Sequence, residues 1–293
     1  MITEERKTIM KFTKMQGAGN DFIVINNIEE KISSQNFEQL ARTLCQRRLS
    51  IGADGMMIVE KAENGGDYRM LFYNSDGSVG EMCGNGARCI CRYGYEKGLA
   101  GDVQRVETTA GLVIGKRVDE RNYTVQLNPI TEMKLDMEAD ADGEKVPCHY
   151  LELGTPGLPH AVVVLDEHAD MTEDGLRLLG RKLRSSKDFR KGANVNFCRV
   201  VGKEEVEELT FERGVEDFTL ACGTGTGSVV AALAMKGLVE GKHTKVHVPG
   251  GQLIISLERA ADGQIEKIFL TGPTNIVAEG MVLDEDLNFE RKI

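Results

Sequence analysis

The sequence has no run of basic residues and no long apolar stretch. Asp and Glu outnumber Lys and Arg by 46 to 36, which gives a formal net charge of −10. A surface with this balance is a poor match for a phosphate backbone or an anionic membrane, so neither nucleic acid nor membrane is expected as a partner. No segment reaches the roughly 18 to 20 apolar residues that span a bilayer, and the opening MITEERKTIMKF lacks the apolar core of a signal peptide. We expect a cytoplasmic protein that acts on a small molecule.

Disulfide bonds and a dinucleotide site are also not expected. The seven cysteines are an odd number, and a chain of 293 residues with 41% hydrophobic residues can bury a core in each of two domains without covalent staples. In a reducing compartment their role is chemistry or core filling. The glycines at 84–88 lack the full GxGxxG pattern and its βαβ context, so they are weak evidence for nucleotide binding.

The chain contains two copies of one unit. The sequence CGNG at 83–86 returns as CGTG at 222–225, an offset of 139 residues, and KGL at 97–99 returns at 236–238 with the same offset. Phe72 matches Phe211, and Asp21 falls opposite His160, where each precedes a β-branched apolar run. Agreement of this kind at one spacing indicates an internal repeat.

We therefore predict two homologous lobes related by a pseudo-twofold axis. The first covers 1–134 and carries Cys83, the second covers 150–283 and carries Cys222, and 284–293 form a tail. The acidic stretch 136–145 is expected to be a strand-poor connection. Within each lobe, short β-branched runs between Gly, Asn and Asp turns favour antiparallel sheet. A helical pattern follows each CGxG motif and ends at Gly98 or Gly237. The predicted fold is α+β, with a sheet or barrel around a central helix in each lobe.

Each repeat places a cysteine at the N-terminal end of its helix. The helix dipole and free backbone N–H groups there can lower a thiol pKa from about 8.5 into the range of roughly 3.5 to 7.5. The same N–H groups suit a carboxylate. Two such ends facing each other would hold one thiol on each side of an α-carbon, so that a thiolate removes a proton from one face while a thiol delivers one to the other. This arrangement predicts a racemase or epimerase.

Other roles for the cysteines remain open at this stage. Cysteine is often a small buried hydrophobic residue, and this is the expected role of five members: Cys45, Cys89, Cys91, Cys148 and Cys198. A zinc site built from Cys83, Cys89 and Cys91 is an alternative, although the spacing is not that of paired CxxC motifs and no histidine is nearby. The repeat favours a catalytic role for Cys83 and Cys222.

Seven segments resemble the diaminopimelate epimerase family in the same order. They are KMQGAGNDFIVI, GADG, FYNSDGSVGEMCGNGARC, GANVNF, ERGVEDFTLACGTGTGS, PGG and TGP, and they extend over nearly the whole chain from Lys11 to Gly280. The resemblance implies a homodimeric isomerase that needs neither pyridoxal phosphate nor a metal. It would convert LL-diaminopimelate to the meso form in the synthesis of lysine and peptidoglycan precursors.

The resemblance also implies the roles of site residues. Cys83 and Cys222 would be the acid and base, and His160 and Glu212 would assist thiol ionisation. The far end of the substrate would contact Asn20, Asn74, Asn194 and Arg213. The carboxylate at the reacting carbon would lie on Gly84, Asn85, Gly223 and Thr224. From the residues alone, a guanidinium suits a carboxylate, whereas asparagines in turns have equally good structural explanations.

The sequence departs from the family pattern at three places. Leu158 stands where the family usually has Asn before Pro-His, Gly55 stands where some members carry Gln, and ERGVEDFTLAC is one residue longer than the commonest form. These changes concern the far end of the substrate rather than the two thiols. A related racemase or epimerase acting on histidine or lanthionine is therefore the main alternative, and a non-enzymatic amino-acid binding or thiol-sensing protein is a second.

Overall fold

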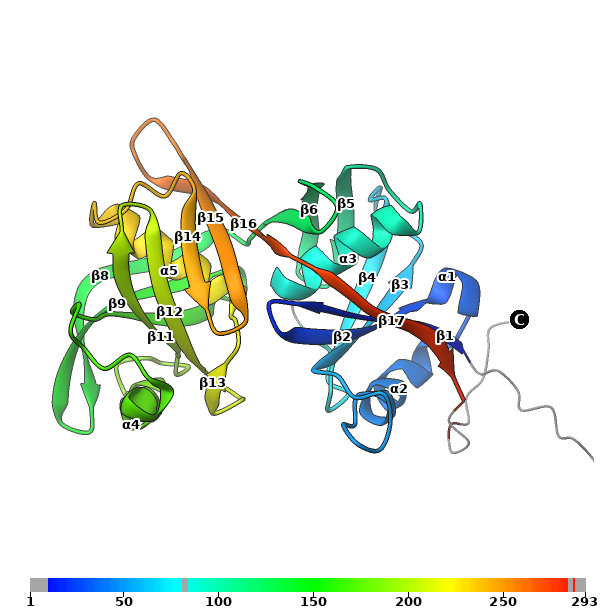
Figure 1. Cartoon of the computed structure of the whole chain (residues 1–293), viewed down its shortest axis with the longest axis horizontal. Coiled ribbons are helices and arrows are strands. Elements are labelled where there is room, and N and C mark those ends of the chain that lie inside the picture. Colours follow the sequence, from blue (N-terminus) through cyan, green and yellow to red (C-terminus); the bar gives the residue numbers. More distant parts are fainter. Residues whose placement is uncertain (1–9, 81–83, 284–286, 288–293) are drawn as a thin grey trace, which may run out of the picture. The chain divides into compact units, whose positions relative to one another are not determined.

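A computed structural model describes residues 10–80, 84–283 and 287, and its contacts divide the chain into two compact units. Unit 1 combines Met1–Tyr123 with Thr274–Ile293, and unit 2 is Thr124–Pro273. Each unit contains strands packed around a buried helix (Figure 1). No helix in the described part of the chain is long and apolar enough to cross a membrane.

Unit 1 begins and ends with strands that pair with each other. Strand β1 is antiparallel to β17, with Met10 opposite Val282. In chain order the elements are β1 (Met10–Gly17), β2 (Asn20–Asn26), α1 (Asn27–Glu30), η1 (Ser34–Asn36), α2 (Phe37–Leu44), β3 (Gly55–Glu60), β4 (Tyr68–Asn74), α3 (Gly84–Glu96), β5 (Val103–Thr108), β6 (Gly111–Arg117) and, after unit 2, β17 (Asn275–Val282).

Unit 2 is entered along β7 (Asn122–Gln126), which starts in unit 1. Its further elements are β8 (Ile130–Ala141), β9 (Glu144–Leu153), β10 (Leu158–Val164), α4 (Glu173–Arg184), β11 (Asn194–Gly202), β12 (Glu205–Glu212), β13 (Asp217–Thr219), α5 (Gly223–Met235), β14 (Thr244–Val248), β15 (Gly251–Arg259) and β16 (Ile265–Pro273).

The two units repeat one strand topology, as the sequence offset predicted. In unit 1, β2 pairs parallel with β3, β3 antiparallel with β4, β4 parallel with β5, and β5 antiparallel with β6. In unit 2 the same order runs through β10, β11, β12, β14 and β15. The predicted two-lobed α+β fold is confirmed, and its sheets contain parallel pairs beside the expected antiparallel ones. A helix between two strands forms a crossover, and a crossover joins parallel neighbours.

The helices α3 and α5 form the centre of the two units. Both have 13 residues and follow the CGxG positions, and every residue of α5 except Met235 is buried. Their ends are alike: Leu99 donates to the carbonyl of Gly94, and Leu238 donates to that of Leu233. Gly98 and Gly237 adopt φ values of 66° and 72°. This is the Schellman ending, which needs a left-handed residue and explains both glycines.

Two boundaries differ from the sequence-based ranges. The strand at 275–282 lies in unit 1 rather than in the second lobe, because it pairs with β1, and residues 124–134 lie in unit 2. The stretch 136–145, expected to be strand-poor, is a β-hairpin formed by β8 and β9. Asp142 and Gly143 form its turn with φ values of 58° and 93°, the Asp-Gly signal typical of a two-residue hairpin.

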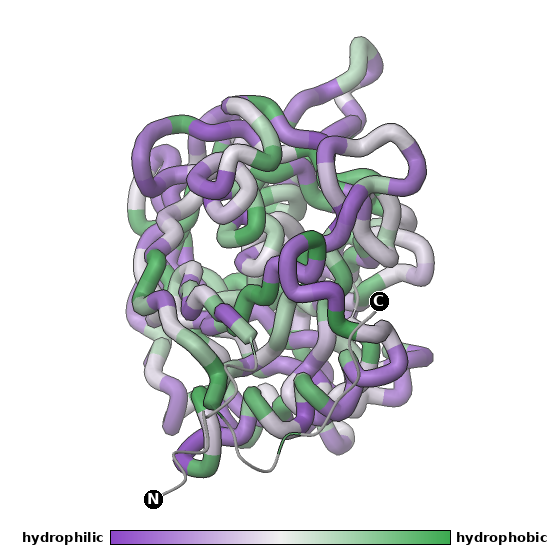
Figure 2. The backbone as a smooth tube through the Cα atoms, turned by 90° about the vertical axis from the view of Figure 1, so that its right-hand side faces the viewer, coloured by the Kyte–Doolittle hydropathy of each residue, from purple (hydrophilic) through white to green (hydrophobic). Residues whose placement is uncertain are grey.

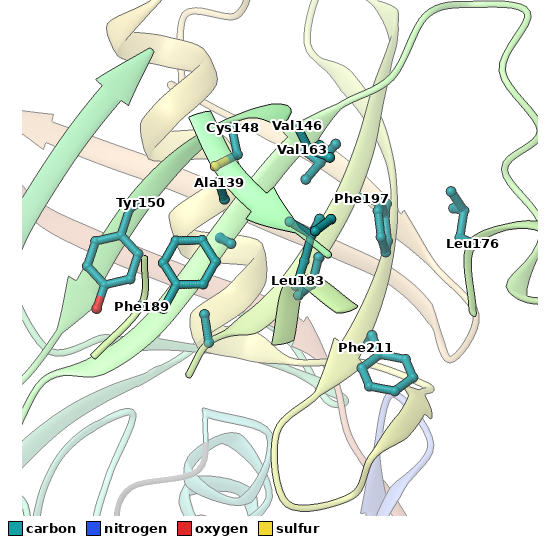
Figure 3. Close-up of a cluster of buried hydrophobic side chains, with 14 residues drawn as sticks. Ala139, Val146, Cys148, Tyr150, Val163, Leu176, Leu183, Phe189, Phe197 and Phe211 are labelled. Atoms are coloured by element: carbon teal, nitrogen blue, oxygen red, sulfur yellow. The ribbon is translucent and has the colours of Figure 1, made fainter. Parts of the chain in front are cut away.

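The core of unit 2 fills the space between its strands and α4. Tyr150 and Phe189 stack with ring centroids 5.3 Å apart, and Leu183 and Phe211 lie in the same cluster (Figure 3). In unit 1, α2 packs its apolar side against β2 and β3. Hydrophilic residues occupy most of the projecting turns (Figure 2). The five cysteines expected to fill the core, Cys45, Cys89, Cys91, Cys148 and Cys198, are all buried, which confirms that prediction.

Candidate active site

Cys222 is the N-cap residue of α5. Its φ and ψ of −121° and 102° are extended, and its carbonyl accepts the Thr226 N–H at 2.8 Å, which starts the helix. The side chain is 8% exposed, and its Sγ lies 3.7 Å from Thr224 Oγ1. The thiol therefore lies at the N-terminal end of a fully packed helix, where the sequence predicted it.

The expectation that the helix end lowers this thiol pKa is wrong for the described structure. Burial raises the pKa of Cys222 well above its usual value, and the charge of Glu212 raises it further. The N–H of Gly225 and the Thr224 hydroxyl lower it, but they do not outweigh the loss of solvent. Cys222 therefore holds its proton in this state and needs an acceptor before it can act as a base.

His160 supplies an acceptor next to that thiol. The imidazole is fully buried on β10, with Nδ1 3.1 Å from Asn196 Oδ1 and Nε2 3.1 Å from Thr224 Oγ1. Burial lowers the pKa of His160 to about 4, so the ring is neutral at physiological pH. A neutral imidazole has one N–H and one free lone pair, which means that it can take up one proton from the Thr224 side or give one to it.

Thr224 connects the thiol to the imidazole. Its hydroxyl contacts Cys222 on one side and His160 on the other. The resemblance implies that Thr224 lies at the substrate carboxylate, and in the structure its hydroxyl contacts Cys222 and His160. Its backbone N–H and that of Gly223 belong to the first turn of α5, where N–H groups have no partner within the helix.

The remaining candidates of unit 2 gather at the same ends of their strands. The register pairs His160 with Asn194 and Val195 with Phe211, so that Glu212 closes β12 beside the start of β11. Asn194 is buried, and its Oδ1 accepts the Arg213 backbone N–H at 2.8 Å. The Arg213 guanidinium donates to the Lys191 carbonyl at 2.8 Å. The structure thus links Cys222 to His160 through the Thr224 hydroxyl and joins Asn194 to Arg213.

The candidates of unit 1 lie at the equivalent strand ends. Because Gly55 of β3 pairs with both Phe22 and Asn74, the start of β2 and the end of β4 flank the start of β3. Asn20 donates to Asp54 at 2.7 Å and Asn74 donates to Ser78 at 2.9 Å. Gly84 and Asn85 open α3, and the buried Asn85 amide accepts from Arg88 at 3.0 Å. Cys83 lies outside the described residues.

Comparison with known proteins agrees with this arrangement. The model of the diaminopimelate epimerase family matches residues 12–131 and 154–277. A diaminopimelate epimerase of Aquifex aeolicus is 36% identical over 289 residues, which cover 96% of this chain and 100% of the relative. One from Methanothrix thermoacetophila is 38% identical, with coverage of 95% and 98%. The chain belongs to the diaminopimelate epimerase family.

More distant structures share the fold. A Bacillus anthracis protein of the PhzF phenazine biosynthesis family aligns with a TM-score of 0.70 at 14% identity, covering 93% of this chain and 98% of the other. A hydroxyproline epimerase from Agrobacterium vitis aligns with a TM-score of 0.68 at 17% identity, with coverage of 95% and 94%. At these identities the likeness concerns the fold alone.

The structure places all three departures from the family pattern. Gly55 is buried, and a Cβ there would lie 2.5 Å from the Phe72 ring, so a larger residue at this position requires a different neighbour. Leu158 is partly buried at the first position of β10, two residues before His160, and pairs with Leu153. The longer segment, 212–222, includes the turn between β12 and β13, where Gly214 and Glu216 have positive φ, and the short strand β13.

A buried polar network beside the site was not predicted from the sequence. Its four members are buried and hydrogen-bond to one another, to His160 and to the start of α5: Asn196, Glu208, Thr210 and Thr226. The available signal was the alternation of β11 and β12, which places polar residues at 194 and 196, and at 208 and 210, on inward-facing positions. Among the described residues, no group of three or more His, Cys, Asp and Glu side chains is arranged to hold a metal ion.

Proposed function

We propose that this protein interconverts LL- and meso-2,6-diaminopimelate by proton transfer at one α-carbon. Membership of the diaminopimelate epimerase family supports the substrate, and the contact of Cys222 with His160 through Thr224 supports the chemistry. This contact is the observation that carries the proposal, because it gives a buried thiol a route by which to lose its proton.

In the proposed reaction two cysteines act on opposite faces of the carbon. One thiolate takes the α-proton, so that a C–H bond breaks and an S–H bond forms. The other thiol gives its proton to the opposite face, so that an S–H bond breaks and a C–H bond forms. Cys222 is one of the pair, and the repeat assigns the other role to Cys83. In the reverse direction the two cysteines exchange roles.

The substrate carboxylates need two separate binding places. Backbone N–H groups at the helix starts, those of Gly223 and Thr224 and those of Gly84 and Asn85, would hold the carboxylate of the reacting carbon as charge builds up on it. Asn20, Asn74, Asn194 and Arg213 would hold the far end. His160 and Glu212 would adjust the protonation of Cys222, and the influence of both on this thiol is consistent with that role.

The biological setting follows from the same proposal. An enzyme with this activity supplies precursors of lysine and peptidoglycan, and we place it in the cytoplasm as a homodimer. The mass in solution, measured by light scattering after size-exclusion chromatography, tests the dimer: twice the 32.2 kDa chain mass is expected, and a single chain mass would contradict it.

The direct test of the reaction uses single stereoisomers followed by chiral chromatography. Purified protein should convert LL-diaminopimelate to the meso form until the two isomers reach an equilibrium mixture. Parallel incubations with L-histidine and L-lanthionine test the alternative, in which a less polar pocket beside Leu158 selects another amino acid. Racemisation of histidine without turnover of diaminopimelate would overturn the proposed substrate while keeping the reaction class.

The variant Leu158→Asn sharpens this comparison, because it restores the amide usual in the family. If Leu158 restricts the pocket, turnover of diaminopimelate should rise and that of a less polar amino acid should fall. If diaminopimelate turnover is already efficient and the variant only lowers it, other residues supply the polar contact and the alternative loses its basis.

A further inference from the structure

Glu208 on β12 is a fully buried carboxyl group that the proposed mechanism does not use. Its side chain is 1% exposed. Oε1 accepts from Asn196 Nδ2 at 2.9 Å and from Thr210 Oγ1 at 3.2 Å, and Oε2 accepts from Thr226 Oγ1 at 2.7 Å. All three partners are neutral and buried. Burial of a carboxyl group lowers the stability of the fold unless hydrogen bonds compensate for the lost solvent. A carboxyl group that is retained in such a network therefore suggests a specific role.

The carboxyl group determines how the Asn196 amide is turned. Asn196 Nδ2 donates both to Glu208 and to Thr210 Oγ1, the latter at 2.8 Å. A flipped amide would bring its oxygen against the oxygen of Glu208, with no proton between them. The amide oxygen of Asn196 therefore faces His160 Nδ1 at 3.1 Å.

The direction of the amide in turn determines the tautomer of His160. An amide oxygen only accepts hydrogen bonds, so Nδ1 must carry the imidazole proton and Nε2 must present its lone pair. That lone pair faces the Thr224 hydroxyl at 3.1 Å, which donates to it. Thr224 then has only acceptor capacity left for the Cys222 thiol. Every bond in this line points from Cys222 towards His160.

We propose that Glu208 is a positioning residue that gives this hydrogen-bond line its direction, so that His160 Nε2 is ready to receive the proton of Cys222 through Thr224. The kinetic consequence rests on the proposed function, whereas the tautomer does not. Glu208 is also linked to the backbone of Cys222, because its partner Thr226 places Oγ1 3.0 Å from the Cys222 carbonyl oxygen.

The network keeps this direction whichever protonation state Glu208 adopts. Burial raises the pKa of Glu208 to about 7, so both forms occur near neutral pH. When protonated, Glu208 can donate through Oε2 to Thr226, which turns its own hydroxyl to the Cys222 carbonyl. Oε1 still accepts from Asn196. Glutamine reproduces this protonated form, with Nε2 in place of the O–H group.

The test is the tautomer of His160, read from long-range ¹H–¹⁵N correlation spectra of the full chain labelled with ¹⁵N-histidine. The chain has five histidines, and the signals of His160 are those lost in His160→Gln. The wild-type protein and Glu208→Gln should both show the Nδ1–H form. Glu208→Leu frees Asn196 to turn, because Thr210 can then donate to its oxygen, and should show both tautomers. Thr226→Val removes a Glu208 contact without touching Asn196 and should resemble the wild type.

Kinetics provide the second readout. Glu208→Leu should lower kcat by about 10- to 100-fold, part of the roughly 10²- to 10⁴-fold that a positioned acid or base contributes. KM should stay nearly unchanged, and Glu208→Gln should restore kcat. A wild-type spectrum with the Nε2–H form would overturn the inference even if no variant folds, and so would a Glu208→Leu protein that keeps the pure Nδ1–H form. Failure of the proposed function would instead appear as absence of epimerisation by a wild-type protein with the expected spectrum.

Discussion

At the residue scale, the pKa of the Cys222 thiol depends on two opposing influences, its position at a helix start and its burial. Its place at the start of α5 favours the thiolate, whereas its burial and the charge of Glu212 favour the thiol. The effect of burial is the larger one, since the free-energy cost of removing a thiolate from water exceeds the stabilisation that the helix dipole provides. In the proposed reaction the thiol form gives a proton in one direction, and the hydrogen-bonded line to His160 would serve the other direction.

Replacement of this thiol gives a direct prediction. Cys222→Ala should abolish epimerisation in both directions, because each thiol is base in one direction and acid in the other. The small buried side chain should leave the fold intact, as circular dichroism would show. Cys148→Ala removes another buried thiol, in the core of unit 2, and should keep turnover. Near-normal turnover by Cys222→Ala would refute its catalytic role.

Glu208 predicts an unusual dependence of stability on pH. Its pKa is raised by burial from 4.5 to about 7, so the folded state binds this proton more tightly than the unfolded state. Its stabilising contribution is complete below pH 4.5 and is lost as the pH rises through about 7. His160 acts oppositely: burial lowers its pKa from 6.5 to about 4, and its contribution is lost as the pH falls towards 4.

The variant Glu208→Gln removes the first of these effects. Between pH 5 and pH 8 the wild type should lose about 2.5 kcal/mol of unfolding free energy relative to this variant, because Glu208 loses its proton over this range more readily in the unfolded state. Urea unfolding at both pH values measures the difference. Glu207→Gln, on the same strand but paired with Arg199 at 2.6 Å near the surface, should change it little. Equal pH dependence in the wild type and Glu208→Gln would contradict the raised pKa.

At the scale of elements, the glycines of α5 allow the helix to approach β11. A Cβ on Gly225 would lie 2.2 Å from Asn196 Nδ2. Gly225→Ala should therefore push the helix start away from Asn196 and His160, with a loss of about 1 to 3 kcal/mol in unfolding free energy, the usual effect of overpacking. Epimerisation should fall as well. Gly101→Ala, where an added Cβ meets nothing, is the matched control. A Gly225→Ala protein as stable and active as the wild type would contradict this packing argument.

The elements also show what could be predicted from the sequence. The two central helices and their glycine endings were predictable because capping is local chemistry, written within five residues of each helix end. The hairpin of β8 and β9 was missed because its many charged residues obscured the buried alternation of Ala139, Ala141, Val146 and Cys148 around an Asp-Gly turn. The parallel pairs depend on crossovers between distant segments, which local periodicity does not reveal.

At the scale of the whole molecule, the repeat predicted the duplication but not its exact division. Strand β17 follows all of unit 2 in the chain and yet pairs with β1, a long-range choice that no local pattern encodes. Of the site, the motif residues His160, Cys222 and Thr224 were predictable, and the structure brings them into contact. The roles of Glu208 and Asn196 could not be predicted, because the partners of a polar residue in a strand depend on which helix packs against that strand.

Two thiols are proposed to act on opposite faces of one carbon, and the origin of the returned proton tests this mechanism most directly. The reaction is started in D₂O from one stereoisomer and sampled early, and hydrogen and deuterium at the α-carbon are measured by mass spectrometry. The thiol that delivers the proton has equilibrated with solvent before substrate binds. The product should therefore carry deuterium at the inverted carbon, while recovered substrate keeps hydrogen. Early product rich in the original hydrogen would show a single base serving both faces and would contradict the account.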